Sequence, residues 1–237
     1  MRYGYYGYWD ATYLLVIIGA VLCMIASARV TGTFNKYSKY RSMSNLTGAQ
    51  AAERILHSSG IYDVTVRHVS GSLTDHYDPR NKTLNLSDSV YGSASVAAIG
   101  VAAHECGHAI QHQKNYAPLS IRGAIVPVAN FGSKLAWPLI LIGLFLGSFM
   151  GSNLILIGII CFSFAVIFQL VTLPVEFDAS ARAMRVLGNT GILGPEELKK
   201  TRKVLSAAAL TYVASATAGI LQLLRLILLF GGRRDRR

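Results

Sequence analysis

The uncharged run LAWPLILIGLFLGSFMGSNLILIGIICFSFAVIFQLVTLPV, residues 135–175, decides the fold class of this 237-residue chain. It holds 41 residues without one Asp, Glu, Lys or Arg. Because about 20 apolar residues suffice to cross the hydrocarbon core of a bilayer, the run is too long for one helix and suits two. The turn residues Gly151-Ser-Asn153 stand near its middle. We therefore expect a membrane hairpin of two helices, at about 135–150 and 154–174.

Two further apolar segments flank this hairpin. Tyr13–Ala28 predicts a first membrane helix, and the tyrosine-rich residues before it are typical of an aromatic belt at a membrane surface. The last segment, Leu205–Phe230, is interrupted by Arg225. A crossing there would leave the Arg-rich end of the chain outside, so we expect this helix to enter the bilayer only in part. The fold class is a mainly α integral membrane protein with three to four transmembrane helices.

The composition supports this class and excludes others. Hydrophobic residues make up 52% of the chain and charged residues 15%, against about 25% charged in an ordinary soluble domain. The formal net charge of +11 is spread over several segments, without the dense basic stripe and interleaved aromatics of a nucleic-acid-binding surface. The three cysteines stand singly, which excludes a disulfide framework and a CxxC metal site. The expected partner is the lipid bilayer, with no nucleic acid; no oligomeric state follows from the sequence.

Basic residues around the first helix predict the orientation. Arg2 alone precedes it, whereas Arg29, Lys36, Lys39 and Arg41 follow it. By the positive-inside rule, the N-terminus lies outside and the following domain faces the cytoplasm. We expect a multi-pass protein of a bacterial cell membrane.

The chain divides into four predicted parts. They are an N-terminal transmembrane helix at 1–30, a water-facing α+β domain at 31–134, the hairpin at 135–175, and a C-terminal part at 176–237 whose last helix is membrane-associated. The sequence Gly194-Pro195-Glu-Glu197 is typical of a helix start.

Within the water-facing domain, local patterns predict a small sheet and two helices. Thr47 and Gln50 form a capping box ahead of a helix that reaches about Leu56. Val64–Val69 reads as a strand, and Thr83–Ser87 alternates polar and apolar residues as a half-buried strand does. A helix of small residues is expected from about Ser95 to Gln113.

The sequence His104-Glu-Cys-Gly-His108 lies on that last helix. Two histidines four residues apart face the same way on a helix, and this spacing suits two ligands of one zinc ion. Glu105 stands beside them and is the candidate general base for the water that attacks a substrate. Cys106 is expected to point away from the metal and to pack in the core.

A catalytic zinc needs a third protein ligand, and every histidine of the chain precedes residue 113. Glu176 directly follows the hairpin, and two membrane crossings return the chain to the face that it left. Glu176 is therefore our candidate third ligand, although Glu176 and Asp178 could also be ordinary interfacial acids. His112, one turn beyond His108, is an alternative ligand, an oxyanion stabiliser or a solvated helix end. His76 and Tyr212 are further candidates for an oxyanion partner, without a spacing argument.

The sequence His-Glu-Cys-Gly-His-Ala-Ile-Gln-His, followed by the hairpin and Leu-Pro-Val-Glu-Phe-Asp-Ala-Ser, resembles the membrane neutral zinc metallopeptidases of bacteria, the YugP type. The resemblance covers nearly the whole chain. It implies a zincin-like catalytic domain of the gluzincin kind, in which a Glu on a later helix, here Glu176, is the third zinc ligand. Many gluzincins carry an Asp four residues after that Glu; this chain has Ser180 there and Asp178 nearby.

These observations predict a membrane-embedded zinc endopeptidase with one Zn²⁺ per chain, held by His104, His108 and Glu176. Its expected substrates are membrane-associated or unfolded proteins cut near the cytoplasmic interface. Thr83–Ser87 is either a candidate edge strand for pairing with an extended substrate or a strand with a purely structural role. The alternatives are a zinc-stabilised scaffold or adaptor without hydrolytic activity, in which Glu105 would have no use, and a small pore, which would not explain the water-facing domain.

Overall fold

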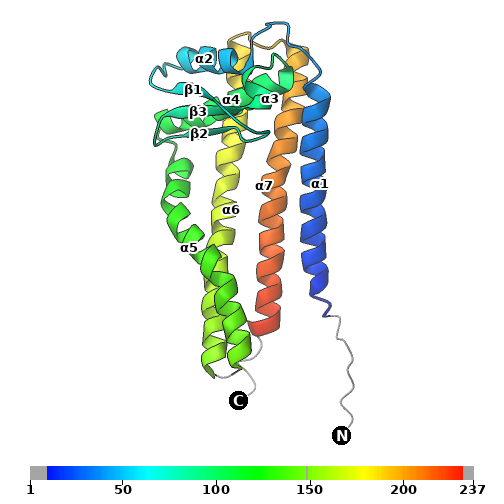
Figure 1. The fold of residues 1–237 in the computed structure, drawn as a ribbon, viewed down its shortest axis with the longest axis vertical. Coiled ribbons are helices and arrows are strands. Elements are labelled where there is room, and N and C mark those ends of the chain that lie inside the picture. The colour runs from blue at the N-terminus through cyan, green and yellow to red at the C-terminus, as the bar shows by residue number, and fades with distance from the viewer. Residues whose placement is uncertain (1–9, 148, 232–237) are drawn as a thin grey trace. The chain divides into compact units, whose positions relative to one another are not determined.

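The computed structural model describes residues 10–147 and 149–231, so most of the tyrosine-rich start and the Arg-rich end lie outside the described residues. The described chain is mostly helical with one small sheet (Figure 1). Its helices are α1 Tyr13–Tyr37, α2 Gly48–Ser58, α3 Asp88–Tyr91, α4 Val96–Gln113, α5 Ala117–Leu146, α6 Phe149–Asn189 and α7 Pro195–Phe230. Its strands are β1 Thr65–Val69, β2 His76–Asp78 and β3 Thr83–Ser87.

Four of these helices are long and apolar enough to cross a membrane, which agrees with the predicted membrane fold. They are α1, α5, the Met150–Asn189 part of α6, and α7. The last apolar segment belongs to α7, one unbroken helix of 36 residues that starts at Pro195 as expected. Its partial entry into the bilayer stays a prediction.

The turn of the hairpin is not where the sequence pattern put it. α5 ends at Leu146 and α6 begins at Phe149, with Gly147 in the left-handed conformation at φ +57°, so the turn precedes Gly151-Ser-Asn153. The prediction of a turn at 151–153 was wrong because Gly151 lies within α6 and is a contact point with α5. A Cβ on Gly143 would lie 2.6 Å from the Gly151 carbonyl oxygen, and glycine at both positions lets the two helices approach closely.

The contacts within the chain define two compact units. The hairpin unit comprises Met1–Ile25, Ile125–Leu170 and Val213–Arg237. The site unit comprises Ala26–Ala124 and Val171–Tyr212, and it contains the sheet together with α2, α3 and α4. All of the predicted site residues belong to the site unit.

The sheet has the order β1-β3-β2, with β3 parallel to β1 and antiparallel to β2. Thr83–Ser87 is therefore the central strand, and the prediction that it is an edge open to a substrate was wrong. All five of its residues are buried rather than alternately exposed, because hydrogen-bonded neighbours lie on both sides and α3 and α4 contact the strand. The alternation of polar and apolar residues indicates the polarity of the side chains. It does not indicate how many strands lie next to this one.

The core of the site unit is built around α4. The predicted capping box starts α2, with Gln50 N donating to Thr47 Oγ1 at 3.2 Å and Thr47 N donating to Gln50 Oε1 at 3.0 Å. α2 then packs on α4 through small side chains, among them the fully buried Ala51 and Ala52. Gly107 lets α6 approach α4, because a Cβ there would collide with the Ala179 carbonyl oxygen.

Candidate metal centre

The histidines predicted to bind zinc meet the predicted carboxylate ligand. α4 places His104 and His108 one turn apart, with their ring centroids 4.8 Å from each other, and α6 supplies Glu176. Glu176 Oε2 lies 3.2 Å from His104 Nε2 and 3.5 Å from His108 Nε2. One potential ligand atom from each of the three residues lies within 4.8 Å of the other two.

The three side chains are largely withdrawn from solvent. Glu176 is 3% exposed and His108 9% exposed, and His104 is half-buried. The close approach of α4 and α6 at Gly107, between the two histidines, explains how a helix 72 residues later in the chain brings its carboxylate onto the rings. A larger residue at 107 would push Ala179, and with it this part of α6, away from α4.

Gln111 sets the orientation of the His108 ring. The Gln111 amide nitrogen donates to the Val175 carbonyl oxygen and to Asp178 Oδ2, both at 2.8 Å. Its oxygen Oε1 is therefore the atom that faces His108 Nδ1 at 3.0 Å, so this nitrogen carries the proton and donates it. The lone pair of neutral His108 is then on Nε2, directed at Glu176.

The other histidine also has a hydrogen-bonding partner at its Nδ1. Ser180 Oγ lies 3.0 Å from His104 Nδ1, which leaves His104 Nε2 toward Glu176. Ser180, four residues after Glu176, thus contacts His104, while Asp178 holds Gln111 and accepts from Arg182 Nε at 2.6 Å. Each metal-ligand candidate on α4 has a hydrogen-bonding partner behind it, as ligating histidines usually do.

This arrangement fits a bound cation. A carboxylate oxygen and two imidazole Nε2 atoms would repel one another as bare acceptors, so a proton or a metal ion must lie among them. Burial by itself would lower the pKa of His108, but the contact with Glu176 and the charge of Glu105 outweigh it and raise the pKa. Two histidines and one Glu are also a donor set of catalytic zinc sites.

Glu105 is held beside the cluster. It is buried at 8% exposure, and its Oε2 accepts a hydrogen bond of 3.1 Å from the backbone amide of Tyr77 on β2. Since β2 is an edge of the sheet, this amide has no strand partner on that side and is free to orient the carboxylate. The bond occupies one carboxylate oxygen.

Two residues that the sequence analysis missed complete the surroundings. Arg122 on α5 donates from Nη1 to Glu176 Oε1 at 3.2 Å, which leaves Oε2 for the histidines. Gln111 could have been found, because it is one turn beyond His108 on the same helix face. Arg122 gave no signal, since no spacing relates it to the motif. Tyr212, a predicted candidate, does lie beside Glu176.

The other candidates lie elsewhere. His112 is exposed at the end of α4, and its Nδ1 is 2.9 Å from the Tyr77 hydroxyl. His76 faces Thr74 and Asn85. Cys106 is fully buried against α2, as expected, and burial raises the pKa of its thiol.

We predict that Gln111→Ala lowers zinc affinity by about 10- to 100-fold, the usual effect of removing a hydrogen-bonding partner of a ligating histidine. Without Gln111, His108 Nδ1 loses its acceptor and the ring can rotate. Competition with a zinc chelator measures the affinity. Gln113→Ala is the matched control, because Gln113 is exposed and bonds only to the Gly60 carbonyl oxygen among the described contacts. Equal affinities of the two variants would contradict the assigned role.

Comparison with known proteins identifies the family of this chain. Residues 12–231 match the family described as "Putative neutral zinc metallopeptidase", and the chain belongs to that family. It is also 49% identical over 221 residues to the "Putative membrane protease YugP" of Bacillus subtilis (strain 168), covering 93% of this chain and 97% of that protein. No solved structure matches the chain. The predicted resemblance to the YugP type is thereby confirmed, and with the four apolar helices it makes the chain a membrane protein.

Proposed function

We propose that this chain is a zinc endopeptidase that holds one zinc ion with His104, His108 and Glu176. The observation that carries the proposal is the convergence of these three donors on one point, with Glu105 fixed beside them. The membership in a zinc metallopeptidase family supports the same chemistry. The gluzincin type of site, with its third ligand on a later helix, is part of the proposal.

Zinc at such a site supplies Lewis-acid chemistry, which acidifies water and polarises a carbonyl oxygen. Glu105 takes the proton of the attacking water on its free carboxylate oxygen, while the Tyr77 amide holds the other oxygen in place. It then donates that proton to the amine that leaves when the peptide bond breaks. Arg122 keeps Glu176 Oε1 occupied and so orients Oε2 toward the histidines.

The scaffold alternative is less well supported. A purely structural zinc site gains nothing from a carboxylic acid next to the metal, and closed structural sites usually have four protein ligands. Here three donors converge among the described residues, and Glu105 has its own positioning bond. This geometry favours an open site at which water and a substrate can react.

The substrates proposed are membrane-associated or unfolded proteins, cut near the cytoplasmic interface. The uncharged run ends at Val175, and Glu176 is the next residue of the same helix α6. At a rise of 1.5 Å per residue, the cluster would lie within about 10 Å of the hydrocarbon boundary. A folded soluble protein has difficulty reaching so close to a bilayer, whereas a juxtamembrane segment does not. The basic residues that follow the first helix support the cytoplasmic orientation.

The test is a set of substrates that carry one cleavable sequence at increasing distances from a membrane anchor. With the zinc-loaded protein in vesicles, we expect cleavage to be fastest close to the anchor and to fall as the spacer lengthens. A chelator should stop cleavage, and added zinc should restore it. Cleavage that is indifferent to distance, or fastest for an unanchored version, would contradict the proposed substrate class without affecting the zinc chemistry.

A further inference from the structure

A basic pocket lies in the site unit, away from the candidate metal centre. It has a volume of about 990 Å³ and is formed by the last turns of α1 and the first part of α7. Five of its lining residues are basic, and all five are exposed. They are Arg29, Lys36, Lys199, Arg202 and Lys203.

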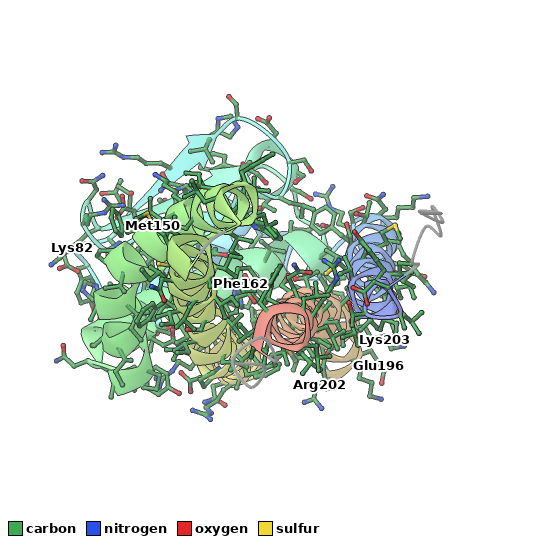
Figure 2. All side chains as sticks on the ribbon, turned by 90° about the horizontal axis from the view of Figure 1, so that it is seen from below. Lys82, Met150, Phe162, Glu196, Arg202 and Lys203 are labelled. Atoms are coloured by element: carbon green, nitrogen blue, oxygen red, sulfur yellow. The ribbon has the colours of Figure 1, made fainter. Side chains whose placement is uncertain are left out.

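The charge of this pocket is poorly compensated. No Asp or Glu lines it, and of the five cations Lys199 alone has an ion pair among the described residues, at 2.6 Å to Glu196. The side chains of Arg202 and Lys203, labelled in Figure 2, are both exposed. Because like charges gathered around one hollow repel one another, binding of an anion would stabilise the arrangement.

The remaining lining has polar and apolar parts. Thr33 and Ser206 offer hydroxyl groups next to the basic side chains, so an anion's oxygen atoms would find hydrogen-bond donors as well as charge. Leu210, which is 40% exposed, is the last lining residue along α7. Along α7 toward its C-terminal end, the lining of the pocket therefore changes from cationic residues to the apolar Leu210. The helix itself becomes apolar in the same direction.

The position along both helices indicates the source of the anion. On α1, Arg29 directly follows the apolar segment Tyr13–Ala28; on α7, Lys203 precedes the apolar segment Leu205–Phe230 by two residues. Both helices therefore present their cations where a membrane helix leaves the hydrocarbon core. Lipid phosphates lie at this level, and basic pockets between membrane helices bind anionic headgroups.

We propose that this pocket binds the phosphate of an anionic phospholipid, with the basic residues of α1 and α7 around the headgroup. The site differs from general attraction to a charged surface, because two helices far apart in sequence contribute to one hollow with a limited volume. It is also independent of zinc binding and of peptide cleavage, since none of its lining residues belongs to the candidate metal centre.

Native mass spectrometry of the purified full chain in detergent tests the proposal, with phosphatidylglycerol and phosphatidylcholine added in equal amounts. We expect preferential retention of phosphatidylglycerol. Arg202→Gln/Lys203→Gln should weaken this retention roughly thirtyfold, because each basic residue near an anionic lipid contributes about a factor of five. Lys36→Gln should weaken it about fivefold; since Lys36 is on α1, a loss in both variants cannot arise from a local defect in α7.

The control is Arg54→Gln/Arg67→Gln, which removes two exposed positive charges of the same unit outside the pocket. This pair should change retention less than twofold. An equal loss in the control pair would show nonspecific attraction and overturn the proposal, as would equal retention of the two lipids. Inorganic phosphate in excess is the second arm: if it displaces phosphatidylglycerol fully, the pocket is a site for soluble phosphate and not for lipid.

Discussion

Glu105→Gln is expected to abolish peptide cleavage while zinc binding is retained. The amide keeps the size of the side chain and an oxygen that accepts from the Tyr77 amide, but it cannot take a proton from water. General-base catalysis contributes about 10²- to 10⁴-fold, so the rate of casein cleavage should fall by at least about a hundredfold. Zinc content, measured on the same preparation by elemental analysis, should stay at one per chain.

Glu53→Gln provides the matched control for this experiment. Glu53 lies on α2, is exposed and belongs to the same unit, so the identical chemical change there should leave cleavage unaltered. If Glu105→Gln cleaves casein as fast as the unchanged protein does, Glu105 is not the base. If the unchanged protein binds zinc and cleaves neither casein nor a membrane-protein substrate, the scaffold alternative is the correct one.

Glu176→Ala is expected to lose zinc. Removing a hydrogen-bonding partner of a ligand costs about 10- to 100-fold in affinity, and loss of the ligand itself should cost at least about a hundredfold. The variant also leaves His104 and His108 without the carboxylate that both Nε2 atoms face. Chelator competition measures the affinity, and His104→Ala and His108→Ala should show losses of the same order.

Two further variants separate loss of a ligand from loss of folding. Glu176→Gln keeps the shape of the side chain and should bind zinc more weakly than the unchanged protein while unfolding at a similar temperature. Glu196→Ala removes an exposed acid on α7 that pairs only with Lys199 among the described residues, and it should keep full affinity. Full zinc occupancy in Glu176→Ala would refute the ligand assignment.

The sequence by itself determined the features that depend on residues near one another along the chain. The length of the uncharged run predicted two crossings, and the capping box at Thr47 and Gln50 predicted the start of α2, because a helix start is a local event. The spacing of His104 and His108 predicted one shared helix face for the same reason. Counting two membrane crossings led to the prediction that Glu176 is the third ligand, and Glu176 does lie beside His104 and His108.

Tertiary structure decided what depends on neighbours from distant segments. Whether Thr83–Ser87 is an edge or a central strand depends on β1 and β2, and whether Gly151 makes a turn or a helix contact depends on Gly143. Arg122 reaches Glu176 from another helix, although no spacing in the sequence relates the two. Side-chain polarity and helical periodicity depend on residues that are near one another in the sequence. The hydrogen-bonding partner of each buried polar group depends on which helices pack together.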